Sequence, residues 1–301
     1  MNLNSDKNYE IKKEIKNMRW LLFAVMLTLF ASEVVFQAVA SFMSNPPNNY
    51  VRMAVVEITA FLIPFALYAK MGSRSFHTKK ELRLNPLSVR KTIFVTLLGI
   101  TGQFVVILLN FPLEYLHQMF ISEKEAVVAE QFSYLTLIQA TLAVGIIPAF
   151  FEEFLIRGMV FRAMNRLSTR GAVWFTTFIF VVFHGKPECI FGYAFMGCMA
   201  VFVMRRTGSL YSAMLYHFAS NMAAVIFGML AIKIVSLLWA LVAVMVILFT
   251  AVFILFYIKY TPEKNVEAKR WTNVFLSSVL SLPILLSIMI VVIKYWLLNL
   301  R

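Results

Sequence analysis

Charged residues are scarce in this chain. Only 14% of its 301 residues are Asp, Glu, Lys or Arg, against about 25% in a typical soluble domain. Hydrophobic residues make up 60%, and 29 residues are phenylalanine. This composition excludes an ordinary soluble protein and predicts a chain that crosses a membrane several times.

Cysteines and acidic residues are also few. Cys189 and Cys198 are the only cysteines, and one pair in or next to an apolar segment gives no disulfide framework. The 15 acidic residues leave a formal charge of +13, which in a soluble protein would suggest a nucleic-acid partner. Here the cations gather in short loops beside apolar runs, which is the signal of membrane topology, so no nucleic acid is expected.

Apolar runs near the length of a membrane-spanning helix predict an all-α, polytopic transmembrane helical bundle of about eight or nine spans. The first run is too long for the apolar region of a signal peptide, despite the cleavage-like Ala38-Val39-Ala40. It is therefore predicted to be retained, and the third run is predicted to stop at Pro112. The predicted spans cover about 20–42, 51–71, 92–111, 135–166, 171–184, 189–204, two within 209–258 that turn near 228–233, and 271–296.

The basic residues predict the orientation of these spans. Most of the 28 lysines and arginines lie in 1–19, 70–91, 157–170, 205–206 and 259–270. An amino terminus in the cytoplasm puts all five of these stretches on the cytoplasmic side, as the positive-inside rule requires.

Two adjacent carboxylates, Glu152 and Glu153, stand inside the fourth apolar run. A charge at this depth costs about 2.5 kcal/mol or more and is therefore a functional candidate. Glu153 and Arg157 are four apart and so can pair on one helix face. Glu152 is turned by about 100° from Glu153 and is free to face a cavity.

Two more pairs with the same spacing follow in apolar surroundings, Phe180 with His184 and His217 with Asn221. Counted from the nearest cytoplasmic arginines, Glu152, His184 and His217 fall in one layer, roughly 16–21 Å deep in straight helices. We therefore expect the three pieces to meet in one buried site.

Such a site allows two kinds of chemistry. In one, a glutamate acts as general base on a water, and histidine and asparagine donate to the oxyanion of a scissile carbonyl. In the other, the same side chains hold a divalent metal that activates the water. No His-Glu-x-x-His is present, so the familiar zinc-protease helix is absent. Glu33 and Glu57 also fall inside predicted spans, but no partner can be named for them and they stay outside the site.

The ordered set of three pairs resembles the CPBP group, which comprises type II CAAX prenyl endopeptidases and the bacteriocin-processing or immunity (Abi) proteins. The resemblance covers about 135–230. It implies that Glu152 and His184 activate the attacking water and that His217 and Asn221 form the oxyanion hole. Glu153, Arg157 and Phe180 are then supporting residues.

The resemblance divides the chain into N-terminal helices and loops (1–134), a catalytic core (135–230) and C-terminal helices (231–301). It also implies an intramembrane endopeptidase with a peptide or protein substrate that enters from the bilayer and is prenylated or of the bacteriocin type. The architecture and the short loops favour a bacterial plasma membrane. No cofactor is favoured. The alternative is a divalent metal such as zinc held by Glu152, His184 and His217.

The sequence is also compatible with two other classes of function. One is a non-catalytic membrane protein for bacteriocin immunity or sensor regulation, and the other is a transporter, for which the paired broken helices are missing. Substitution of Glu152 or His184 separates these readings, because it abolishes an enzyme's effect and spares a scaffold's.

Overall fold

The structure, a computed structural model, is helical throughout the residues that it describes, which are 3–70, 82–120, 133–230 and 235–299. One isolated bridge between Ser168 and Glu267 is the only β pairing within those ranges. The elements in chain order are α1 (Leu3–Ser41), α2 (Asn49–Lys70), α3 (Val89–Phe120), α4 (Tyr134–Ala140), η1 (Thr141–Ile146), α5 (Ile147–Glu153), η2 (Phe154–Phe161), α6 (Arg162–Asn165), α7 (Thr169–His184), η3 (Pro187–Cys189), α8 (Ile190–Thr207), α9 (Leu210–Leu230), α10 (Val235–Lys259), α11 (Trp271–Val279) and α12 (Leu282–Asn299).

The predicted polytopic bundle is confirmed. Within the described residues, seven helices are long and apolar enough to cross a membrane, and the bent pair α11 and α12 makes eight if it is counted as one span. The remaining predicted span is α7, which at 16 residues is shorter than the roughly 20 residues that a full crossing needs. The chain is an integral membrane protein.

Three predicted spans depart from their predicted boundaries. The prediction that the third span stops at Pro112 is wrong, because α3 continues through this proline to Phe120. Proline removes one backbone donor, but a helix that ends inside the bilayer would expose many more unpaired backbone groups. The last span is broken by a 57° bend between α11 and α12.

The third departure is α1, which begins at Leu3 and not near Trp20. Its polar first half carries apolar residues at helical spacing, Ile11, Ile15, Met18 and Leu22, and all four are buried. An apolar stripe of this kind lets a polar segment continue as a helix that packs on its neighbours.

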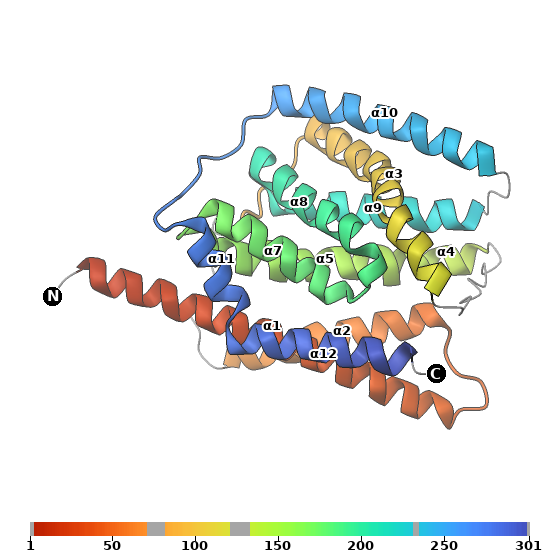
Figure 1. The fold of residues 1–301 in the computed structure, drawn as a ribbon, viewed down its shortest axis with the longest axis horizontal. Coiled ribbons are helices and arrows are strands. Elements are labelled where there is room, and N and C mark those ends of the chain that lie inside the picture. Colours follow the sequence, from red (N-terminus) through yellow and green to blue (C-terminus); the bar gives the residue numbers. More distant parts are fainter. Residues whose placement is uncertain (1–2, 71–81, 121–132, 231–234, 300–301) are drawn as a thin grey trace. The chain divides into compact units, whose positions relative to one another are not determined.

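The chain forms two compact units, each of which is discontinuous in sequence. The first comprises Met1–Leu84, Phe151–Gly185 and Lys264–Arg301, and the second comprises Asn85–Phe150 and Lys186–Glu263. In the first unit α1 packs along α2 and α12, and α7 packs against α11 (Figure 1). In the second unit α3 packs against α8, α9 and α10. The predicted division into 1–134, 135–230 and 231–301 stays a prediction.

The two arginines at the end of the fourth predicted span are paired within the first unit. Glu14 of α1 accepts hydrogen bonds from Arg162 and from Nη1 of Arg166, the latter at 2.8 Å. The first half of α1 is thereby fixed to the end of the helix that carries Glu152 and Glu153.

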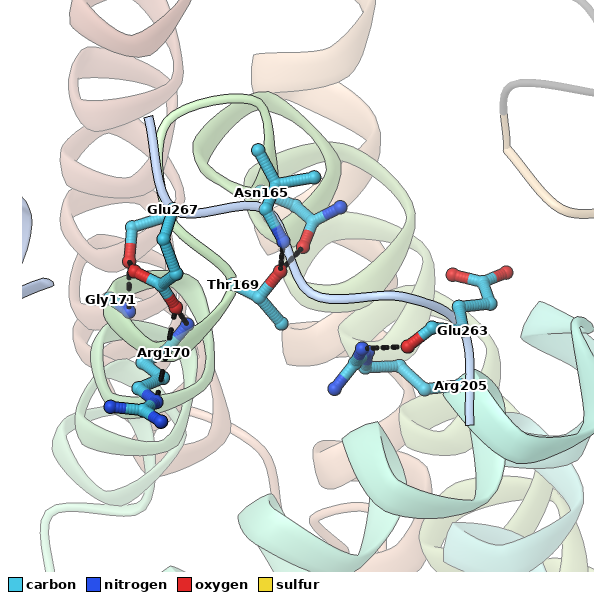
Figure 2. A network of polar contacts seen from close by, with 9 residues as sticks. Asn165, Thr169, Arg170, Gly171, Arg205, Glu263 and Glu267 are labelled. Atoms are coloured by element: carbon cyan, nitrogen blue, oxygen red, sulfur yellow. Dashed lines mark hydrogen bonds and ion pairs between the residues drawn. The ribbon is translucent and has the colours of Figure 1, made fainter. Parts of the chain in front are cut away.

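The start of α7 is fixed by the segment that precedes α11 (Figure 2). Glu267 accepts from the Ser168 hydroxyl at 2.7 Å and from the Arg170 amide at 3.3 Å. The amide of Thr169 donates to the Val266 carbonyl at 2.7 Å, and its hydroxyl accepts from the Val266 amide at 2.8 Å. A carboxylate at a helix N-terminus also interacts favourably with the helix dipole. The other end of α7 stops at Gly185, whose φ of 60° favours glycine.

Candidate active site

The two adjacent glutamates differ in their surroundings. Glu153 is fully buried, and its Oε1 accepts a hydrogen bond from Nη1 of Arg157 at 2.8 Å, with both side chains inaccessible to solvent. The predicted pairing of Glu153 with Arg157 is confirmed. Glu152 is partly exposed, as expected for a neighbour on a different face of the same helix.

The helix that carries them is not regular. Residues Thr141–Ile146 and Phe154–Phe161 on either side of α5 form π-helical turns. π-Helical turns are rare in proteins, and those that occur are often found at functional sites. Their effect is to change the direction in which the side chains before and after the glutamates project.

Phe180 of α7 lies between two other predicted site residues. The guanidinium carbon of Arg157 is 4.6 Å from the centroid of the Phe180 ring, within the range of a cation–π interaction. The ring of His184 lies against Phe180 with its centroid 4.5 Å away. Phe180 therefore connects the buried ion pair to the histidine.

The orientation of His184 follows from one hydrogen bond. Its Nδ1 lies 2.8 Å from the carbonyl oxygen of Phe180. A carbonyl only accepts, so Nδ1 carries the proton in the neutral ring and Nε2 carries the lone pair. A histidine held in this tautomer presents Nε2 as a base or as a ligand. We refer to Glu153, Arg157, Phe180 and His184 as the site column.

His217 and Asn221 lie on α9 in the second unit. His217 is 1% exposed. Nδ2 of Asn221 donates to the carbonyl oxygen of Val144 in the first π-helical turn at 2.8 Å. The amide carries two N–H groups, so a second one remains to donate elsewhere.

The close approach of α3 and α9 determines where His217 lies. A Cβ added at Gly99 of α3 would meet Ala219 Cβ and the Tyr216 carbonyl, each at 2.7 Å. Real Cβ atoms do not approach so closely, so the contact requires glycine. His217 lies between Tyr216 and Ala219 in the sequence of α9, so this contact holds the part of α9 that carries His217.

The predicted site residues thus fall into two groups. Glu152 and the site column belong to the first unit, and His217 and Asn221 belong to the second. That the two groups act on one substrate stays a prediction.

The proposed metal ligands do not fit a closed metal site. Among the described residues, no three His, Cys, Asp or Glu side chains come together as metal ligands would. Glu152 and His184 offer suitable donor atoms, but two ligands are fewer than zinc takes from protein in most catalytic sites. A divalent metal held by Glu152, His184 and His217 stays a prediction.

One part of the chain matches a known protein family. Residues 134–223 match the family model described as type II CAAX prenyl endopeptidase Rce1-like. The family resemblance is confirmed. The Rce1-like segment begins at α4, contains all seven predicted site residues and ends just after Asn221. No curated protein and no solved structure matches the chain.

Some features of the Rce1-like segment were not predicted from the sequence. The placement of Phe180 between Arg157 and His184 depends on how α7 packs on η2, which residue spacing does not specify. The bond from Asn221 to Val144 depends on the π-helical turn, for which the apolar sequence gives no signal.

Proposed function

We propose that the protein is an intramembrane endopeptidase that hydrolyses a peptide bond of a membrane-associated substrate. The observation that carries the proposal is the site column, which holds His184 so that Nε2 carries the lone pair in the neutral ring, in a segment that matches a family of CAAX endopeptidases. The substrate is proposed to be prenylated or of the bacteriocin type, and the enzyme to lie in a bacterial plasma membrane with its amino terminus in the cytoplasm.

The proposed reaction begins with proton transfer from water to Glu152, assisted by Nε2 of His184. The resulting hydroxide adds to the scissile carbonyl carbon, and the oxyanion accepts hydrogen bonds from His217 and Asn221. When the tetrahedral intermediate collapses, the C–N bond breaks and the proton returns to the leaving nitrogen. The products are a new carboxylate and a new amine.

In this scheme the buried ion pair has a supporting role. The Glu153–Arg157 pair lies beside Phe180 and keeps α7 in register with the helix that carries Glu152. Glu152 rather than Glu153 is the base, because Glu153 is buried and occupied by Arg157 while Glu152 is partly exposed.

The test is cleavage of a fluorogenic prenylated peptide library by the purified, reconstituted protein. We expect wild type to cleave and Glu152→Gln to lose about 100-fold or more of the rate, as for loss of a general base. Glu10→Gln, which changes an exposed carboxylate of α1, is the matched control and should keep the wild-type rate.

A chelator such as phenanthroline separates the two forms of the mechanism. Activity that persists in the chelator supports the glutamate mechanism, and activity that is lost and then restored by zinc supports a metal. Wild-type activity that survives Glu152→Gln would contradict the assignment of the base. Absence of cleavage across prenylated and unprenylated libraries would favour the non-catalytic immunity or regulatory role.

A further inference from the structure

Three cations from three different helices meet around one aromatic pair in the second unit. Phe94 of α3 and Tyr260, which follows α10, have ring centroids 6.1 Å apart. Nζ of Lys91 lies 5.9 Å from the Tyr260 centroid. Nζ of Lys259 lies 5.4 Å from the Phe94 centroid, and both distances are within the range of a cation–π interaction. Nη1 of Arg206, in the last turn of α8, donates a hydrogen bond to the Tyr260 carbonyl oxygen. We refer to Lys91, Arg206 and Lys259 as the cation cluster.

The contacts that hold the cation cluster in place do not neutralise its charge. Nζ of Lys91 donates to the Thr207 carbonyl oxygen at the end of α8, at 2.9 Å. Nη1 of Arg206 also donates to the Tyr257 carbonyl oxygen near the end of α10, at 2.7 Å. A helix C-terminus carries about half a negative charge, so these two ends offset only part of three full positive charges. Within the described ranges, no member of the cluster forms an ion pair.

The residues next to the cation cluster are basic as well. Arg90 precedes Lys91 in the sequence, and Arg205 precedes Arg206. Among the described residues of the second unit, Glu263 is the one acidic residue at these helix ends. It lies beside Arg205, whose Nη2 donates to the Glu263 carbonyl oxygen (Figure 2). One carboxylate is thus present for five cations.

Arginines of the first unit show the contrast. Arg52 forms an ion pair with Glu33, and Arg162 and Arg166 both pair with Glu14. Cations held close together without a counter-ion repel one another, and ionised groups in membrane proteins are almost always paired. The cation cluster therefore calls for an anion that the described part of the chain does not supply.

The surface that adjoins the cation cluster favours a lipid over a soluble anion. Val89 and Ile93, on either side of Lys91 in the sequence of α3, are 77% and 55% exposed, and Ile258, next to Lys259 in α10, is 74% exposed. Both helices are long and apolar enough to span a membrane, and they pack on each other (Figure 1). Basic pockets between transmembrane helices bind anionic lipid headgroups, and exposed apolar side chains beside such a pocket can contact acyl chains.

We propose that the cation cluster binds the phosphate group of one anionic phospholipid, whose acyl chains lie along the exposed apolar residues of α3 and α10. Lys91 uses one of its three N–H donors for Thr207, which leaves donors for phosphate oxygens. The predicted orientation puts these helix ends at the cytoplasmic leaflet, where anionic lipids gather. The inference does not depend on the proposed endopeptidase function.

The test measures lipid binding to the purified full-length protein in neutral detergent by native mass spectrometry. We expect wild type to bind one phosphatidylglycerol about tenfold or more tightly than phosphatidylcholine. Each basic residue removed should weaken phosphatidylglycerol binding about fivefold, and so Lys91→Gln/Lys259→Gln should weaken it about 25-fold. Binding of phosphatidylcholine should not change.

The matched control is Lys12→Gln/Lys13→Gln, which removes the same charge from two exposed lysines of α1 in the first unit. It should keep the wild-type affinity for phosphatidylglycerol. Lys259→Gln alone guards against misfolding, because Lys259 makes no hydrogen bond through its side chain within the described ranges. This variant should still lose about fivefold in affinity.

Three results would overturn the proposal. The first is equal affinity of the wild type for the two lipids. The second is an equal loss in the cluster variants and in the α1 control, because the lipid would then respond to overall charge. The third is competition by glycerol phosphate in large molar excess, because this compound carries the phosphate without acyl chains and would assign the cation cluster to a soluble anion.

Discussion

Four side chains of the first unit contact one another in a row, and each limits the position of the next. Glu153 accepts a hydrogen bond from Arg157, and Arg157 lies over the Phe180 ring. Phe180 contacts the His184 ring, and its carbonyl oxygen accepts a hydrogen bond from Nδ1–H of that histidine. The arrangement explains why the two pairs spaced four residues apart occur together. A rigid, buried support allows one histidine nitrogen to be presented in a fixed direction.

Arg157→Gln tests the buried end of the site column. The change leaves the Glu153 carboxylate buried without its cation, which costs about 3 kcal/mol or more of stability. The measurement is reversible unfolding in detergent micelles. The exposed Arg170, whose Nε lies 4.0 Å from Glu267, gives the control Arg170→Gln, for which the loss should stay below about 1 kcal/mol.

The double variant Glu153→Gln/Arg157→Gln completes the Arg157 test. Because it removes both charges, it should recover part of the stability that Arg157→Gln loses. A double variant that is as unstable as the sum of both single changes would show that the two side chains do not interact.

Phe180→Leu tests the middle of the site column. Loss of the ring removes the contacts to Arg157 and to the imidazole, and we expect kcat to fall about tenfold or more as His184 loses its fixed position. Phe178→Leu is the matched control, because Phe178 lies on the same helix and contacts Phe275 instead. Equal effects of the two changes on kcat would show that only helix packing matters.

At the scale of elements, sequence patterns located nearly every helix. Apolar length predicted the spans, and Gly185 and Gly208, both with positive φ, end α7 and α8 close to the predicted positions. The continuation of α3 through Pro112 was missed because a proline's local effect is outweighed by packing, here of Phe111 on Trp239 at 4.7 Å. The π-helical turns were missed because they arise from tertiary contacts that local sequence does not encode.

Gly99→Ala tests the contact between α3 and α9. The added methyl group would lie 2.7 Å from the Ala219 Cβ and the Tyr216 carbonyl, so α9 must shift and carry His217 with it. We expect a loss of about 1–3 kcal/mol in stability, together with lower cleavage activity. Gly228→Ala is the control, because nothing lies within 4 Å of its added Cβ. A neutral Gly99→Ala would contradict the close packing of the two helices.

At the scale of the molecule, the family match and the structural units divide the chain differently. The matched segment, 134–223, contributes to both units. The candidate site residues and their spacing are read directly from the sequence. Which of them share a unit depends on chain topology, and spacing alone gives no information on it.

The proposed orientation is tested by cysteine labelling from outside intact cells. In the variant without native cysteines, Lys12→Cys and Ser44→Cys place single thiols before and after the apolar part of α1, both at exposed positions. With the amino terminus in the cytoplasm, an impermeant reagent outside intact cells should label position 44 and not position 12. The opposite pattern would reverse the orientation that the positive-inside rule predicts.

The central claim is that the two groups of residues serve one transition state, and its most direct test is the cleavage rate of four proteins on one prenylated peptide. These are wild type, Glu152→Gln, His217→Ala and the double variant. Residues that act as a unit in catalysis are strongly non-additive. We predict that each single change abolishes most of the rate and that the double variant is little slower than the slower single variant. Independent losses that multiply in the double variant, or a His217→Ala protein as fast as wild type, would contradict the claim.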